Sequence, residues 1–500
     1  MVNGTPEVLD GLLSPSNIAK ISELSDKLQS CLETSATDIS SSLIAASDEK
    51  LHEAVLLTVA YISSKVESDL KTAQVEELVR SLGGKAIVLG TDKSQSNLIT
   101  EAAVVGIDIA SSARPLALDK DILIKLTAVT NPQDPWATPI AASAASRVLA
   151  EQVSDQRLPE FIANDILQKT LKPLFTKPSS RITASGRPSQ YATVDDRSQA
   201  FSEVHPWKSQ APWAEATIQW AINASTASLI KSHWPLFMPV LLALVEDESI
   251  EVKARGLRSL IVFVEKCPVQ LLQSTGIGRV FADVAFPFLL YLPSVTPEDQ
   301  SVTILGPAYD VLIKLAECAG SPDNSERRRF LDRILRDGVF AGHHHASQHT
   351  RIVQILIQKA ATVVNCLGIY SIKHLSPLLS MSSSVMTDPF AVAYPPTLLA
   401  TTQLIGAIII NAWPRVREPE HMENIIRILS LCWLNVLEEL EHTVSKDQEE
   451  GLQALHQELA SKAKALKALW ADNTSKRPSK LDEVLEKEPR LTGLFSTASA

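Results

Sequence analysis

The most constraining feature of this chain is the stretch from His233 to Cys267, which has the pattern of two consecutive helices joined by a short acidic turn. Pro235 predicts the start of the first helix, because a missing N–H costs least in a first turn. Asp247 and Glu248 form the turn, and Ser249 is a suitable N-cap for the second helix. The apolar positions of that second helix recur at spacings of four, three, four and three: Ile250, Ala254, Leu257, Ile261 and Val264.

The opposite side of the second helix is charged, with Glu251, Lys253, Arg255 and Arg258. A helix pair of this kind buries one surface and must cover its remaining apolar surface against neighbouring pairs. This is the pattern of a HEAT-type repeat. We therefore expect an all-α fold, a HEAT-like helical-repeat α-solenoid, and solenoids of this kind mostly bind other proteins.

The composition supports this fold class and argues against a nucleic-acid partner. Apolar residues make up 45% of the 500 residues but aromatic residues only 5%, which favours helix on helix over sheet packing. The formal net charge is −10, whereas proteins that bind nucleic acids need a surplus of Lys and Arg to neutralise phosphates. We expect no nucleic-acid partner.

The cysteines and the first residues predict an intracellular protein. The five cysteines are far apart and form no CxxC pair: Cys31, Cys267, Cys318, Cys366 and Cys432. An odd, scattered set is a poor disulfide framework. Glu7 and Asp10 stand where a signal peptide needs positive charge and then an apolar run, so secretion is not expected.

One stretch tests the expectation that the chain does not enter a membrane. The segment from Pro389 to Pro414 contains no charged residue and is long enough to span a bilayer. Pro395 and Pro396 would break a spanning helix, however, and the segment contains several Thr, Gln and Asn residues. We favour a buried repeat helix that starts at Pro396 over a membrane span.

The apolar periodicity divides the chain into four predicted regions. Residues 1–175 form an irregular helical N-terminal region, and residues 176–203, rich in Ser, Pro and Arg, form a flexible loop or linker. Residues 204–445 form the HEAT-like repeat core, in which ten predicted helices suggest about five stacked pairs. Residues 446–500 form a charged C-terminal helix and tail.

The C-terminal helix carries a narrow apolar stripe on a strongly charged background, made by Leu452, Leu455, Leu459, Ala463, Leu466 and Trp470. Such a stripe needs a partner surface. Two arrangements are open. The helix either packs on the last repeat as a cap or exchanges with another subunit or chain.

Two patterns suggest ligand chemistry, and both are incomplete. His345 and His349 would share a helix face beside His343 and His344, but the HExxH glutamate is absent and no Cys is near. Gly83, Gly84 and Lys85 resemble the end of a phosphate loop, yet the first glycine and the Ser or Thr that binds magnesium are missing. We expect no metal, no cofactor, no small-molecule substrate and no enzymatic activity.

A basic cluster in a predicted helix at residues 326–336 is a candidate protein-binding site. Arg327, Arg328 and Arg329 could bind an acidic partner. The alternative is a solvated helix face, since Asp332 and Asp337 are interleaved and the apolar residues form a buried side. The apolar stripe of the C-terminal helix supplies the other predicted partner-binding residues, Leu452, Leu455, Leu459, Leu466 and Trp470.

Several short motifs, in this order, resemble the Tti-two family, the second Tel-two-interacting protein, and are most similar to its fungal members. They are Pro235–Val245, Val252–Leu257, Ser274–Phe281, Leu305–Asp310, Glu326–Arg329, Thr387–Phe390, Tyr394–Pro396 and Cys432–Leu434. The resemblance covers about residues 234–435. Each motif alone is weak, but their order is specific.

This resemblance implies a helical-repeat subunit of the TTT complex, with Tel-two-like and Tti-one-like proteins as partners. The family's complex acts as an adaptor of the ninety-kilodalton heat-shock chaperone that matures phosphatidylinositol 3-kinase-related protein kinases. The resemblance therefore implies a cytoplasmic and nuclear location, and it offers no catalytic residues. Two other hypotheses stay open from the residues alone: a transport adaptor of the karyopherin type, and a metal enzyme that uses the histidine run.

Overall fold

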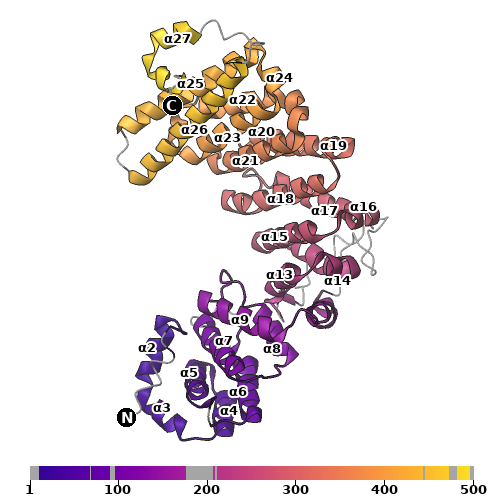
Figure 1. The fold of residues 1–500 in the computed structure, drawn as a ribbon, viewed down its shortest axis with the longest axis vertical. Helices are drawn as coiled ribbons and strands as arrows, with labels where there is room; N and C mark the ends of the chain where they lie inside the picture. Colours follow the sequence, from indigo (N-terminus) through magenta and orange to yellow (C-terminus); the bar gives the residue numbers. More distant parts are fainter. Residues whose placement is uncertain are drawn as a thin grey trace. The chain divides into compact units, whose positions relative to one another are not determined.

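The structure is a computed structural model that describes residues 9, 11–67, 69–90, 96–175, 207–208, 211–442, 445–471 and 481–495. Within these ranges every regular element is a helix and no strand is present (Figure 1). The predicted all-α, helical-repeat fold is confirmed.

The chain divides into two compact units. The first contains Met1–Asp247 with Lys266–Pro268, and the second contains Glu248–Glu265 with Val269–Ala500. The division falls between the two helices that the sequence analysis pairs, so their pairing stays a prediction, as do the four predicted regions.

The first unit contains helices of very different lengths, including two stretches of π-helix, η1 and η2. Its elements are α2 (Pro15–Glu23), α3 (Ser25–Leu32), α4 (Ala36–Ala45), α5 (Asp48–Lys65), α6 (Thr72–Ser81), η1 (Leu82–Ala86), α7 (Ser96–Ala113), α8 (Lys120–Thr127), α9 (Pro139–Gln152), α10 (Leu158–Glu160), η2 (Phe161–Leu171), α11 (Lys172–Leu174), α13 (Ala214–Ala224) and α14 (Ala227–Val245).

Helix α7 is the central element of the first unit, because it packs against both α5 and α9. Most of its residues are buried, among them the carboxylate of Glu101. A buried charge is costly unless hydrogen bonds satisfy it. Here the backbone N–H of Ser14, the side-chain amide of Asn17 and the hydroxyl of Thr138 all donate to Glu101.

The predicted linker at residues 176–203 lies outside the described residues, but its flanks are described. The rings of Phe175 and Trp207 are both buried and stack with centroids 5.5 Å apart. Next to them, Lys208 forms an ion pair of 2.9 Å with the fully buried carboxylate of Asp247. Both flanks therefore belong to the first unit.

The prediction that Pro235 starts a helix is wrong. Helix α14 begins at Ala227, where the hydroxyl of Thr226 accepts a hydrogen bond from the N–H of Leu229, and both Pro235 and Pro239 lie inside it. A proline inside a helix costs about 3 kcal/mol, because it removes one hydrogen bond and crowds the preceding turn. Most of the apolar side chains of α14 are buried, and this burial offsets the cost.

The second unit consists of successive helix pairs followed by a short C-terminal segment. Its elements are α15 (Ile250–Lys266), α16 (Val269–Thr275), α17 (Ile277–Ala285), η4 (Phe286–Leu290), α18 (Glu298–Cys318), α19 (Ser325–Arg333), η5 (Ile334–Phe340), α20 (Ala341–Ala346), α21 (Thr350–Leu367), η6 (Gly368–His374), α22 (Leu375–Met386), η7 (Pro389–Ala393), α23 (Pro395–Asn411), α24 (Trp413–Val416), α25 (Pro419–His442), α26 (Lys446–Ala471), α27 (Leu481–Lys487), η8 (Pro489–Leu491) and α28 (Thr492–Phe495).

Helix α15 forms as its sequence predicts, except that Lys253, expected on its charged outer side, is buried. Ser249 accepts a hydrogen bond of 3.5 Å from the N–H of Val252, which satisfies one of the free donors of the first turn. Ala254, Leu257 and Val264 are fully buried, whereas Ile250 and Ile261 are only partly covered. Gly256 is also buried inside the helix.

We expect Gly256→Leu to lower the thermal midpoint of unfolding. A glycine in a helix interior costs about 1 kcal/mol relative to alanine, so its burial here indicates that the packing needs the small residue. A leucine would have to force its neighbours apart, at a cost of about 1–3 kcal/mol. Circular dichroism of the variant checks this, with the exposed Arg258→Leu on the same helix as control. An unchanged midpoint for Gly256→Leu would contradict the close packing.

One layer of the second unit is made by the second helix of each pair. Helix α18 packs on α21, α21 on α23, and α23 on α26. Each of these helices also packs on the first helix of its own pair. Helix α18 packs on α17, α21 on the η5 and α20 segment, α23 on α22, and α26 on α25. Figure 1 shows these helices following one another in chain order from α18 to α26. This is the stacking of a helical-repeat array.

The segment considered as a membrane span forms η7 and α23, and most of α23 is buried in this layer between α21 and α26. Length and composition alone would allow two other described stretches to cross a bilayer. These are Ala227–Val245 and Thr350–Met386. In the first stretch 56% of the most apolar window is buried inside the protein, and in the second stretch 44% is. Buried core helices pass the same test, so neither is strong evidence for a span.

Candidate protein-interaction surface

The layer of second helices has two edges, which we call the start edge and the end edge. At the start edge, where these helices begin, the turns at 290–299, 347–351 and 387–396 lie together. His349 and Glu298 are joined at 2.8 Å, and Arg351 forms an ion pair of 2.6 Å with Asp299. The hydroxyl of Thr397 donates to the carbonyl of Thr350 at 3.3 Å. These bonds connect α18, α21 and α23 at their N-termini.

At the end edge, where α18, α21 and α23 finish, the turns at 319–329, 368–374 and 410–418 lie together. The side-chain amide of Asn411 donates to the side-chain oxygen of Asn365 at 2.8 Å. Lys359 forms an ion pair of 2.5 Å with Asp310 on the same layer. Side-chain contacts of this kind fix neighbouring repeats against each other.

The predicted arginine cluster lies on the end edge, and its three members have different environments. Arg327 donates to the carbonyls of Gly320 and Cys366, at 2.9 and 3.5 Å, and so satisfies carbonyls where two helices end. Arg328 stacks on the ring of Tyr370 at 4.0 Å. Arg329 is exposed. Arg327 is thus committed to the fold, while Arg328 and Arg329 face outward from it.

The predicted partner-binding leucines lie inside the second unit. Leu452, Leu455, Leu459 and Leu466 are fully buried, as is Ala463, and helix α26 packs on α23 and α25. Trp470 is partly covered. The structure therefore shows the first of the two predicted arrangements, in which this helix packs on the last repeat. A role of these residues in binding a partner stays a prediction.

The C-terminal segment covers α25 and α26 further. The indole N–H of Trp433 donates to the carbonyl of Arg490 at 3.1 Å, and its ring stacks on His456 at 3.9 Å. The side chains of Leu491, Leu494 and Phe495 are buried. The carbonyl of Phe495 accepts a hydrogen bond from Lys467. Terminal repeats of solenoids need such a cap to cover their apolar outer face.

The histidine run does not form the predicted shared helix face. Helix α20 ends at Ala346 and α21 begins at Thr350, so His345 and His349 do not lie on one helix. His349 instead faces Glu298. Burial, and then the charge of His344, lowers the pKa of His343. No group of three His, Cys, Asp or Glu side chains in the described part of the chain is arranged to hold a metal ion.

The glycine-rich segment resembling a phosphate loop forms the π-helix η1. The ammonium of Lys125 donates to the carbonyls of Gly83 and Gly84, at 2.8 and 3.2 Å, beside a pocket of about 640 Å³. Burial lowers the pKa of Lys125. A phosphate loop needs backbone N–H groups aimed at the ligand, whereas this segment presents carbonyls to a cation. The arrangement does not fit a nucleotide phosphate.

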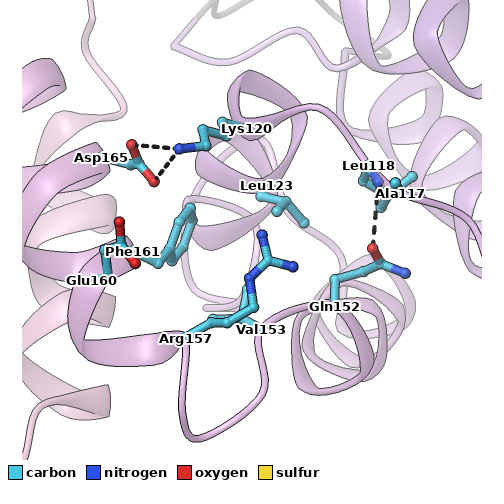
Figure 2. A pocket seen from close by; sticks show the side chains of 10 residues that line it. All are labelled: Ala117, Leu118, Lys120, Leu123, Gln152, Val153, Arg157, Glu160, Phe161 and Asp165. Carbon is cyan, nitrogen blue, oxygen red and sulfur yellow. Dashed lines mark hydrogen bonds and ion pairs between the residues drawn. The ribbon is translucent and has the colours of Figure 1, made fainter.

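A second pocket, of about 180 Å³, lies between α8, α9 and η2 in the first unit (Figure 2). Lys120 and Asp165 form an ion pair of 2.9 Å at its wall, and Asp165 also pairs with Lys169 at 3.0 Å. Burial would raise the pKa of Asp165, but hydrogen bonds from the two lysines outweigh it and hold this pKa below its ordinary value. The carboxylate is thus fixed as an anion between two cations, which suits it to joining helices.

Comparison with protein-family models gives a match to the Tti2 family over residues 122–393. The match covers more than half of the 500 residues. The chain belongs to the Tti2 family. This confirms the resemblance found from the motifs, and it supports the identity of the chain as a subunit of the TTT complex.

The Tti2 match differs in extent from the motifs that indicated it. It begins at Ile122 in α8, well before the first motif at Pro235. It ends at Ala393, so the Tyr394–Pro396 and Cys432–Leu434 motifs lie beyond it. The arginines of α19 lie within the matched range. The Tti2 family is a family of non-catalytic co-chaperone scaffolds, which directs attention to the edges of the repeat array.

Sequence reasoning missed the exposed apolar side chains at both edges. Leu290, Val295 and Phe390 lie at the start edge, and Ile369, Ile410 and Trp413 lie at the end edge. Phe390 is 83% exposed and closes the Thr387–Phe390 motif. In a sequence, an apolar residue in or beside a periodic helix is interpreted as a core residue. Only its position next to a turn could have suggested that its side chain is exposed.

Proposed function

We propose that this protein is a non-enzymatic scaffold subunit of the TTT complex. In this role it holds a Tti-one-like and a Tel-two-like subunit and supports chaperone-dependent maturation and stability of phosphatidylinositol 3-kinase-related protein kinases. The proposal places it in the cytoplasm and the nucleus, and links it to telomere maintenance, the DNA damage response and TOR signalling through those kinases. The family match over residues 122–393 is the observation that carries it.

The architecture supports this proposal physically. A stacked array of helix pairs presents long edges rather than one enclosed site, and such surfaces suit protein partners. Lys120, Asp165 and Lys125, which line the two described pockets, are engaged in ion pairs and carbonyl contacts that hold neighbouring helices. The most exposed apolar side chains of the second unit lie in turns along its edges.

A tagged full-length protein purified from native cells tests the proposal, with mass spectrometry of everything that copurifies. We expect two helical-repeat subunits in near-equal amounts, together with the heat-shock chaperone and giant kinases in smaller amounts. Depletion of the protein should then lower the steady-state level of those kinases. Recovery of a Ran-type GTPase in place of these subunits would favour the karyopherin alternative and contradict the proposal.

A further inference from the structure

The end edge of the second unit carries a ridge of exposed apolar and aromatic side chains. Ile369 is 50% exposed, Ile410 is 69% exposed and Trp413 is 41% exposed. Arg328 covers one end of this ridge, where its guanidinium lies 4.0 Å from the centre of the Tyr370 ring.

Contacts between the turns bring together the segments that carry these side chains. The hydrogen bond between Asn365 and Asn411 joins the ends of α21 and α23. Ile410 directly precedes Asn411, and η6, which contains Ile369 and Tyr370, packs on α23. At the far end, the guanidinium of Arg417 lies 4.6 Å from the centre of the Trp413 ring. We call Arg328, Ile369, Tyr370, Ile410, Trp413 and Arg417 the end ridge.

The end ridge is held rigidly before any partner binds. Gly368 ends α21 with φ +57° and ψ −133°, a conformation open almost only to glycine, and this sharp turn directs the chain into η6. The hydroxyl of Tyr370 donates to Asp323 at 3.0 Å. A surface that is already ordered loses less side-chain entropy on binding, which favours affinity.

The two edges of the repeat layer differ in charge. The turns of the end edge, residues 319–329, 368–374 and 410–418, contain six basic and three acidic residues. The turns of the start edge, residues 290–299, 347–351 and 387–396, contain one basic and three acidic residues. The end edge is thus locally basic in a chain with a net charge of −10. A partner with acidic residues is steered toward the end edge and away from the start edge.

We propose that the end ridge docks an acidic, amphipathic surface helix of a partner subunit. The inference rests on the proposed function, since it assigns a surface to one of the expected helical-repeat partners. Trp, Tyr and Arg are the residue types that dominate binding energy at protein interfaces, and here they alternate with two exposed isoleucines. The apolar face of the partner helix covers Ile369, Ile410 and Trp413, and its carboxylates meet Arg328, Arg329 and Arg417.

The start edge is a weaker candidate for the same partner, although Val295 and Phe390 are more exposed than any apolar residue of the end ridge. These two side chains stand in separate turns that are joined by polar bonds. The acidic surplus of the start edge also repels an acidic helix. The two edges therefore provide a matched comparison within one unit.

The test uses the full-length protein and measures its affinity for purified Tti-one-like and Tel-two-like subunits, each immobilised separately. We expect Trp413→Ala to weaken binding to one of them about 30-fold or more, and Ile410→Ser to weaken it by a similar factor. Arg328→Glu with Arg329→Glu should slow association and flatten the salt dependence. Val295→Ser and Phe390→Ser are the matched controls and should bind as the unmodified protein does.

Each outcome decides between hypotheses. Ile410 is mostly exposed, so Ile410→Ser should keep its thermal midpoint and report on binding even if Trp413→Ala disturbs the fold. Binding of neither subunit by the unmodified protein contradicts the proposed function itself. Full binding by the end-ridge variants, or a loss of binding confined to the Val295 and Phe390 variants, contradicts the proposed docking surface but leaves the proposed function standing. A homodimer that Ile410→Ser dissociates would identify a second copy of the chain as the occupant and overturn it too.

Discussion

Replacing Glu101 with alanine is expected to destabilise the first unit by about 3 kcal/mol or more. The side chain of Glu101 is fully buried in α7, and its two oxygens accept three hydrogen bonds. Removal of the carboxylate takes an acceptor from three donors that are at least partly buried, and a buried donor left unsatisfied costs about 1–3 kcal/mol. The variant also leaves a cavity in the centre of the unit.

The position of Glu101 between two helix N-termini explains why a buried carboxylate is tolerated there. Ser14 is the N-cap of α2, and its N–H donates to Glu101 at 2.8 Å. Thr138 is the N-cap of α9, where its hydroxyl accepts from the N–H of Ala141 and donates to Glu101 at 2.6 Å. Helix N-termini carry partial positive charge and stabilise anions. Glu101 therefore joins the starts of α2 and α9 to α7.

Hydrogen exchange measured by mass spectrometry is the appropriate readout for Glu101→Ala, because a chain with two compact units need not unfold in one step. We expect faster exchange in α2, α7 and α9. Glu101→Gln keeps the shape and most of the acceptors and should give an intermediate loss. Glu151→Ala, at an exposed position on α9, should change stability by less than about 0.5 kcal/mol. Equal stability of Glu101→Ala and the unmodified protein would show that the network contributes nothing.

Helices with strong local signals were predictable from the sequence. Helix α9, from Pro139 to Gln152, is of this kind, because Thr138, Pro139 and the following apolar pattern are all local signals. The start of α14 was not predictable from Pro235, because the burial of its apolar side chains outweighs the local preference of proline for a first turn. The expectation for His345 and His349 failed for a similar reason, since a break between α20 and α21 separates them.

Features that depend on distant residues could not be read from local pattern. The partners of Glu101 lie between 37 and 87 residues away in the sequence, and one glutamate in an apolar helix looks like a surface charge until they are placed. The same holds for the candidate interaction surface. The arginines of α19 formed a visible local cluster, but the end ridge combines side chains from three separate turns that only the stacking of repeats brings together.

The second large effect is expected at Gly90, where substitution by alanine should destabilise the first unit by about 3 kcal/mol or more. Gly90 has φ +74°, which disfavours any residue with a Cβ, and an added Cβ would overlap the ring of Pro212. The proline ring cannot move aside as a flexible side chain could. The loop after η1 and the start of α13 would therefore have to separate.

Two other glycines of the first unit separate the two causes. Gly11 has φ +82° with open space around its missing Cβ, so Gly11→Ala should show the conformational cost alone, about 1–2 kcal/mol. Gly84 in η1 has no positive φ, and a Cβ added there would have open space within 4 Å, so Gly84→Ala should be neutral or stabilising. The amount by which Gly90→Ala lowers the free energy of unfolding more than Gly11→Ala does then measures the cost of the overlap with Pro212.

Urea unfolding followed by circular dichroism, with hydrogen exchange in α13 as a local readout, measures these variants. The double variant Gly90→Ala with Pro212→Gly removes the ring and should recover the part of the loss that the overlap causes. Failure of this rescue, together with equal losses for Gly90→Ala and Gly11→Ala, would show that the contact between Gly90 and Pro212 does not constrain the first unit. The rescue isolates the contact between Gly90 and Pro212, which are 122 residues apart in the sequence. It does so because the single and double variants are all compared with the unmodified protein and all change the same unit.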